Sequence, residues 1–295
     1  MTTVSRSVLN LTILVLARSF AFSNDSVADD KILLRTRLMS SMSFRYDAET
    51  KSSQVMSVMG QEMTTEAASS VRLRMTVKDA ALDRSQIVCS FSDAASKMSL
   101  RGMDPQQTKM DSTIDLSKYD GAEMSFTIDT RGNVISIDRA KDSEASAFVS
   151  SMRILDRINV SFPQQEVGVG DSWIRNTSDT TAFGQASDEV VTTMTLKSTY
   201  VGMRDTLGTK CWLIETVSTT FDQHGTISSR GIDMELDGSG TFRSRSYVEE
   251  RTGMIVATKG DVMSDVRMSI SGQDAMVIPV DTHLTFSVQR RTGNK

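Results

Sequence analysis

The stretch 142–173, DSEASAFVSSMRILDRINVSFPQQEVGVGDSW, divides the chain into two parts and decides how they are arranged. Its first half has apolar residues at three- and four-residue spacing, which predicts one amphipathic helix. The apolar stripe consists of Ala145, Phe148, Val149, Met152, Leu155 and Ile158. Pro163 cannot continue a helix, and the glycines at 168 and 170 permit a tight return into a strand. The helix either covers a sheet or forms a movable lid over a pocket.

The residues before this helix alternate between apolar and polar side chains. Apolar residues occupy most even positions over 32–46, and a second alternating run covers 71–78. Such alternation predicts half-buried antiparallel strands. A further strand is expected over 53–64 with Gly60 as a bulge, and 92–118 is expected to be a long loop. The tetrad 129–132 between two apolar runs predicts a β-hairpin.

The residues after the helix repeat this pattern with similar landmarks. Met59-Gly60-Gln61 corresponds to Phe183-Gly184-Gln185, Cys89 to Cys211, and the turn 129–132 to 250–253. Offsets that agree within a few residues predict a duplication, with chance matching of short polar words as the alternative. We therefore expect a mainly β protein with two similar antiparallel, curved meander sheets, half-barrel-like, and one central amphipathic helix. The expected order is a first β-rich half (24–141), the helix and connector (142–163) and a second β-rich half (164–295).

The first 23 residues have the order of a secretory signal peptide. Arg6 precedes a mostly apolar run at 8–17, and Ala21-Phe22-Ser23 is a small-x-small cleavage site. Ten residues are too few to span a bilayer, and an uncleaved membrane anchor is the alternative. No cysteine follows the run, so no bacterial lipid-attachment site is expected. The mature protein is expected to be periplasmic or secreted, and not membrane-spanning.

The mature chain is expected to be acidic. Removal of 1–23 takes away Arg6 and Arg18 and no acidic residue, which leaves 31 basic against 37 acidic residues and a net charge of −6. Nucleic acids and anionic membranes bind cationic surfaces. Nucleic acid is therefore not expected as a partner, whereas a lipid, another apolar ligand or an envelope protein is compatible with this charge.

The sequence offers few residues for catalysis or metal binding. Cys89 and Cys211 are a candidate disulfide in an exported chain, with two buried free thiols as the alternative. Without a Cys-x-x-Cys pair and with two histidines in all, no metal site and no cofactor is predicted. Gly170-Asp171-Ser172 resembles the nucleophile word of one esterase superfamily. Asp281-Thr282-His283 lacks the Asp-x-x-His spacing of that superfamily, so no catalytic residue is predicted.

Methionine is over-represented, with 19 residues. Thioether side chains are flexible and polarisable, so they either fill irregular gaps in a core or line a pocket for a variable apolar ligand. In the second interpretation, an acyl chain lies on a concave sheet rich in Met and Leu, under the helix. The candidate lining residues are Phe148, Met152 and Leu155 on the helix and Met42, Met75, Met194 and Met234 on the strands.

The junction from Phe162-Pro163 to Val169-Gly170-Asp171-Ser172-Trp173 resembles that of uncharacterised exported bacterial β-rich proteins with a Pro…Val-Gly-Asp-Ser-Trp motif. Long meander strands with a helix across them are also loosely similar to the half-barrel fold of bacterial lipoprotein carriers and lipid-binding lipoproteins. This resemblance implies an apolar cavity under the helix and no catalytic residue. A non-enzymatic envelope protein that binds a lipid is the leading expectation. The alternative is a structural or protein-interaction module of the cell envelope.

Overall fold

Long antiparallel strands make up nearly all of the structure. The computed structural model describes residues 31–102, 110–138, 160–182, 189–229, 232–270 and 275–291, all within the unit Lys31–Lys295. In chain order, the elements within these residues are β1 (Ser43–Val58), β2 (Gln61–Ala80), β3 (Arg84–Arg101), β4 (Met110–Asp115), a 3-10 turn (Ser117–Tyr119), β5 (Glu123–Asp129), β6 (Val134–Asp138), β7 (Ser172–Ala182), β8 (Glu189–Thr206), β9 (Thr209–Ser229), β10 (Ile232–Glu249), β11 (Ile255–Ile270) and β12 (Met276–Arg290). The prediction of a mainly antiparallel β protein is confirmed.

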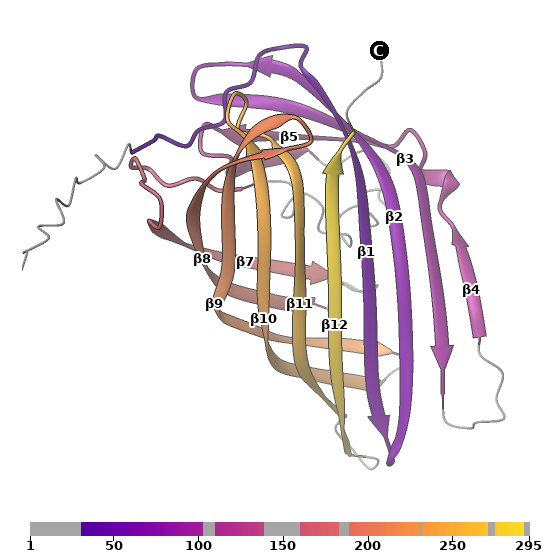
Figure 1. Ribbon diagram of the computed structural model, residues 1–295. Coiled ribbons are helices and arrows are strands. Elements are labelled where there is room, and N and C mark those ends of the chain that lie inside the picture. The colour runs from indigo at the N-terminus through magenta and orange to yellow at the C-terminus, as the bar shows by residue number, and fades with distance from the viewer. Residues whose placement is uncertain are drawn as a thin grey trace, which may run out of the picture. The chain divides into compact units, whose positions relative to one another are not determined.

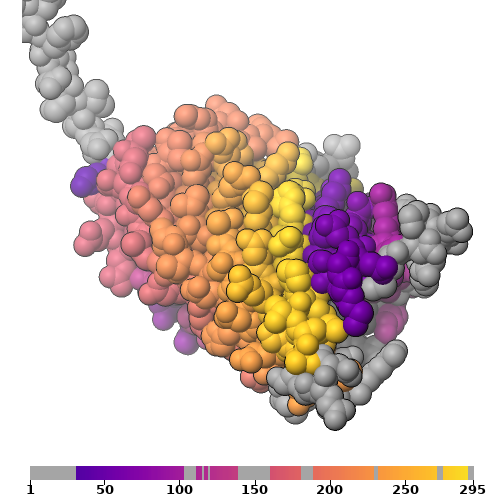
Figure 2. All heavy atoms as spheres, turned by 90° about the horizontal axis from the view of Figure 1, so that it is seen from below, coloured from indigo at the N-terminus to yellow at the C-terminus, as the bar shows by residue number. Residues whose placement is uncertain are grey.

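These strands form one continuous sheet. Their order in the described residues is β6-β5-β3-β2-β1-β12-β11-β10-β9-β8-β7, with β4 beside β3. The two halves of the chain join where β1 pairs antiparallel with β12, and Figure 2 shows the yellow β12 bordering the indigo β1. The second half is an unbroken meander, and β8 to β10 bend along their length, so the sheet is curved (Figure 1).

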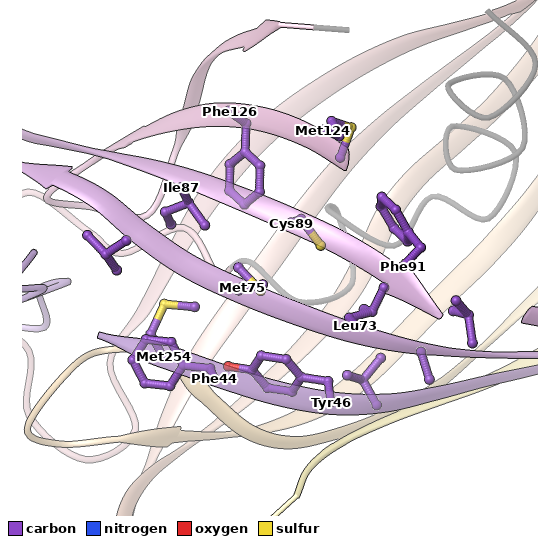
Figure 3. Packing of buried hydrophobic residues seen from close by; sticks show 14 of the residues in the cluster. Phe44, Tyr46, Leu73, Met75, Ile87, Cys89, Phe91, Met124, Phe126 and Met254 are labelled. Atoms are coloured by element: carbon purple, nitrogen blue, oxygen red, sulfur yellow. The ribbon is translucent and has the colours of Figure 1, made fainter. Parts of the chain in front are cut away.

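The alternation within each strand sorts side chains onto two faces. On the first half, the even positions of β1 and the odd positions of β2 and β3 are buried, and together with β5 they form the largest core cluster. Tyr46, Met75 and Phe126 are fully buried there, and Figure 3 shows these side chains gathered from neighbouring strands. We call the face that carries this core the inner face. In each half it is the apolar alternation of the sequence that defines it.

A segment without regular strand structure, residues 31–42, lies across several strand ends, and we call it the strap. Its backbone bonds reach four separate parts of the chain: Ile32 pairs with Val167, and the amides of Thr36, Arg37 and Ser41 donate to the carbonyls of Thr130, Thr252 and Val77. Leu34 is buried in a second core cluster with Phe162, Trp212 and Ile255. The strap thus ties the β5–β6 turn, the β10–β11 turn and the segment before β7 together.

Three local predictions for the first half are wrong. The alternation at 32–46 comes mostly from the strap, and strand pairing begins only at Ser43. Gly60 is not a bulge but lies with Met59 in the tight turn between β1 and β2, where both residues have positive φ. The predicted loop 92–118 is largely strand, because β3 continues to Arg101 and pairs with β4. The predicted hairpin at 129–132 is confirmed between β5 and β6.

Several predicted features lie outside the described residues. They include the leader 1–23, the helix over 142–158 with Phe148, Met152 and Leu155, and the triplet 183–185. The duplication stays a prediction. Its other landmarks occupy matching places, since Cys89 lies in the third strand of the first half and Cys211 in the third strand of the second.

The candidate disulfide is not formed in this structure: Cys89 in β3 and Cys211 in β9 are both free and buried. Burial raises the pKa of the Cys89 thiol to about 12 and that of Cys211 to about 11. Because the thiolate is the reactive form, we expect a disulfide-exchange reagent at pH 8 to modify neither residue in the folded protein. Two thiols should react in strong denaturant, and one in each Cys→Ser variant. Denatured, unreduced protein that shows no reactive thiol would contradict this structure.

Candidate ligand-binding site

Three phenylalanines lie on the inner face of the second half, and two of them lie against glycines on neighbouring strands. A Cβ on Gly240 would lie 2.2 Å from Cδ1 of Phe221, and one on Gly260 would lie 2.5 Å from Cζ of Phe286. Phe242 stacks on Phe286 with ring centroids 6.0 Å apart and an interplanar angle of 17°. Glycine on a strand permits such close approach of a ring. The rings therefore lie close against the sheet instead of standing away from it.

Small hydroxyl side chains beside these rings satisfy one another. The hydroxyls of Ser198 and Thr216 are 2.9 Å apart across β8 and β9, and those of Ser246 and Thr258 are 2.9 Å apart across β10 and β11. A buried hydroxyl without a partner would be costly, and cross-strand pairing removes that cost. Beside the rings, the sheet is therefore lined by short, uncharged side chains whose hydroxyls are already hydrogen-bonded to each other.

The flat rings and short hydroxyl residues leave a hollow of about 180 Å³. It is lined by Val160, Ser161, Arg175, Thr177, Ser178, Asp179, Met194, Leu196, Ser198, Thr216, Phe221, Phe242, Ser244, Ser246, Thr258, Val262 and Phe286. Ligand pockets for drug-sized molecules are typically ~300–1,000 Å³. The hollow therefore suits a slender ligand rather than a bulky one.

A larger hollow of about 710 Å³ lies over β12, β1, β2, β3 and β4. Most of its lining residues, including Lys51, Lys97 and His283, occupy the strand positions that alternate with the inner-face residues. It is therefore a broad depression of the polar outer surface. We take the smaller inner-face hollow as the candidate site, because seven apolar side chains, three of them phenylalanines, line it beside short hydroxyl side chains and two charged ones.

Segment 160–171 passes beside this hollow and is fastened on both sides. The Trp173 indole Nε1 donates to the Ser161 carbonyl at 2.8 Å, and the Ser161 hydroxyl donates to the side-chain oxygen of Asn133. The Phe162 amide donates to the Arg131 carbonyl at 2.8 Å, and the Phe162 ring packs edge-on against Trp212 at 5.8 Å. This segment connects the β5–β6 turn with the first residues of β7.

The structure separates the methionines that the sequence groups as lining residues. Met194 lines the hollow. Met75 is fully buried in the first-half core and Met42 packs against that core, while Met234 pairs with Ile270 at another level of the sheet. Met42 and Met75 thus belong to ordinary packing, and Met234 is not a lining residue of the hollow. The sequence analysis did not predict the contacts of Phe221 with Gly240 and of Phe286 with Gly260. The two alternating glycines in the strand sequence LDGSGTF (236–242) could have indicated a close approach to the sheet.

The residues considered for hydrolysis are far apart. Ser172 begins β7 and its hydroxyl lies 2.9 Å from that of Thr199, while Asp171 accepts a hydrogen bond from the Gly168 amide in a turn. Asp281 and His283 lie on β12, five strands away in the sheet order. Across the described ranges, no group of three His, Cys, Asp or Glu side chains is arranged to hold a metal ion.

No family model matches the sequence, and no curated protein matches it. Among solved structures, the chain is similar to lipovitellin, in a structure on its lipid–protein interactions, at 11% identity with a TM-score of 0.48. That match covers 88% of this chain but only 26% of the lipovitellin chain. A DUF1329 family protein from Desulfovibrio piger matches at 10% identity with a TM-score of 0.15, over 84% of this chain and 87% of that protein's chain. The translocator domain of autotransporter NalP from Neisseria meningitidis matches at 9% identity with a TM-score of 0.21. That match covers 85% of this chain and 89% of the NalP chain.

The helical part of the described structure is short compared with a membrane span. Within the described residues, no helix is long and apolar enough to cross a bilayer.

Proposed function

We propose that the protein is exported and binds a lipid or another slender apolar ligand, without catalysing a reaction. The observation that carries this proposal is the inner-face hollow over Phe221, Phe242 and Phe286. An acyl chain there is removed from water at a gain of ~25 cal/mol per Å² of apolar surface. It displaces no protein hydrogen bond, because the pairs Ser198–Thr216 and Ser246–Thr258 are already made.

The direct experiment is native mass spectrometry of the protein purified from its source, followed by solvent extraction. A lipid or fatty acid that stays with the folded protein and is released on unfolding would support the proposal. Repeated recovery of ligand-free protein that also binds no added fatty acid or fatty alcohol would overturn it.

A substitution that fills the hollow provides a sharper test. Ser244 lines the hollow and Ser239 is exposed on the opposite face of the same strand, β10. Ser244→Trp is expected to weaken binding of a fluorescent fatty acid by about tenfold or more, because overpacking a filled site costs ~1–3 kcal/mol. Ser239→Trp, the matched control, should bind like wild type. Equal affinity of all three proteins would place the ligand elsewhere.

A second candidate function is docking of an envelope protein. Within the described residues, β6 and β7 end the strand order, and Ile135, Ile137 and Ile174 on them are exposed. Edge strands with exposed apolar residues pair readily with another chain. Recovery of a stoichiometric protein partner with lipid-free protein would favour this function over ligand binding.

A further inference from the structure

The inner-face hollow adjoins a second hollow, which is lined largely by segment 160–171. This outer groove, about 570 Å³, is lined by Lys31, Arg131, Asn133, Ser161, Phe162, Pro163, Gln164, Gln165, Glu166, Val167, Asp171, Ser172, Trp173, Ile174 and Arg175. Two residues, Ser161 and Arg175, line both hollows. The apolar interior and the outer groove therefore meet at these two side chains, between β7 and the segment that crosses it.

Arg175 is placed at this boundary by strand register. It pairs with Leu196 of β8, which lines the hollow, and it lies two residues after Trp173, which is fastened to Ser161. Arg175 is partly buried and occupies the same face of β7 as Thr177 and Asp179. An arginine at an apolar–polar boundary usually places its stem along the apolar side and its charge on the polar side, and the position of Arg175 between the two hollows fits this arrangement.

The surroundings of Arg175 carry further positive charge. Arg131 and Lys31 line the groove. The Arg131 Nε atom is buried, makes no hydrogen bond within the part of the chain described, and lies 4.0 Å from a carboxylate oxygen of Asp129. Arg35 lies close to Arg131, and its guanidinium donates to the carbonyls of Pro163 and Gln164 at 2.6 Å each.

Acidic groups are also present, and most of them have partners. Asp171 accepts from the Gly168 amide, and Asp129 accepts from the amides of Arg131 and Asn133. Glu166 lies in the groove and Asp179 in the hollow, and Asp179 has an interaction partner. The boundary therefore carries charges of both signs, and Arg175 is the cationic side chain that lines both hollows.

We infer that the ligand is a single-chain anionic amphiphile, with its acyl chain over the phenylalanines and its carboxylate or phosphate head at Arg175. This inference rests on the proposed function and adds the ligand class and the position of its head. Arg175 already has an interaction partner. A guanidinium has five N–H donors in a planar fork, so it can keep that partner and still bind a carboxylate or phosphate. Arg175 thereby selects acids over neutral lipids of equal chain length.

The test compares decanoate, decyl phosphate, decanol and acetate by isothermal titration calorimetry on wild type, Arg175→Gln and Arg175→Lys. Wild type is expected to bind decanoate or decyl phosphate about tenfold or more tightly than decanol, as a charge-assisted hydrogen bond allows. Arg175→Gln should lose this preference while its decanol affinity changes less than twofold. Arg175→Lys should keep part of the preference, and Arg74→Gln, on an exposed position of β2, should keep all of it.

The outcomes separate the two proposals. Equal binding of decanoate, decyl phosphate and decanol by wild type would overturn the assignment of the head and leave apolar binding intact. Acetate binding as tight as decanoate would overturn the placement of the acyl chain over the phenylalanines, because the tail would then contribute nothing. An acid preference that persists in Arg175→Gln would rule out Arg175 as its source. Failure of all ligands with a chain would instead remove the proposed function.

Discussion

Replacement of Arg290 by methionine is expected to lower the free energy of unfolding by about 3–5 kcal/mol, because it leaves the buried Glu249 carboxylate with only an exposed cation, Arg251, as its ion-pair partner. The Arg290 guanidinium donates to Glu249 at 2.9 Å, and the two side chains are only 15% and 11% exposed. Thr252 donates a second hydrogen bond to the same carboxylate, and Arg290 lies 6.0 Å from the centroid of the Phe44 ring. Both charges are therefore held inside the packed end of the sheet.

The neighbouring residue supplies the control. Arg291 is 47% exposed and forms a surface ion pair with Asp47 at 3.5 Å. Exposed pairs contribute about 0–1 kcal/mol, so Arg291→Met should change stability by less than about 1 kcal/mol in urea titrations. The double variant Arg290→Met, Glu249→Gln should recover part of the loss, because the uncompensated charge is gone. Equal losses at 290 and 291 would show that the Glu249 pair is not buried in solution.

The same pair predicts that acid lowers the stability of the wild type more than that of Arg290→Met. Burial by itself raises the pKa of Glu249, but hydrogen bonds from Thr252 and Arg290 and the charges of Arg290 and Arg251 hold it below its usual value. A carboxylate with a lowered folded-state pKa stabilises the protein above its unfolded pKa, about 4.3 for Glu, and loses that contribution as pH falls through the folded value. In Arg290→Met, the hydrogen bond and the charge of Arg290 no longer lower the pKa of Glu249, so this pKa is higher than in the wild type. The gap in stability between variant and wild type should therefore narrow on acidification.

Local alternation in the sequence predicted several strands and their buried faces. Val71, Leu73, Met75 and Val77 are all buried, as their spacing indicates, and the turn at 129–132 has the predicted place between two strands. Alternation does not reveal whether an extended segment is paired. Residues 32–42 alternate because one side of the strap packs on the turns and the other meets solvent, and this pattern is the same as that of a strand.

The candidate site was harder to predict, because it depends on register between strands. Phe221 meets Gly240 because the register that pairs Asp222 of β9 with Ser239 of β10 brings their neighbours together. No spacing within β10 alone contains that register, so the glycines could be noticed but not assigned to a ring. Methionine content pointed to an apolar interior, but Met75 fills the core in one half while Met194 lines the hollow in the other. Residue type alone cannot distinguish these two roles.

Replacement of Gly253 by alanine is the second change expected to have a large effect, about 2–5 kcal/mol of destabilisation. Gly253 lies in the β10–β11 turn with φ of +70°, where a side chain costs roughly 1–2 kcal/mol. Its Cβ would also lie 2.4 Å from the Arg35 carbonyl oxygen and 2.7 Å from the Thr36 Cα atom. Both are backbone atoms of the strap, so the clash adds about 1–3 kcal/mol of overpacking and pushes the strap from the turn.

Gly208 isolates the contribution of the strap. It has the same φ of +70° in the β8–β9 turn, but a Cβ there meets nothing within 4 Å. Gly208→Ala should therefore be destabilised only by the cost of a side chain at positive φ. The difference between the two variants in the free energy of unfolding, measured in urea, then reports the contact with the strap. Trp212 shares a core cluster with Leu34, so its fluorescence should change in Gly253→Ala and stay unchanged in Gly208→Ala. Identical losses would mean that the strap leaves the turn at little cost, and that the end of the sheet is held by the β-ladders alone.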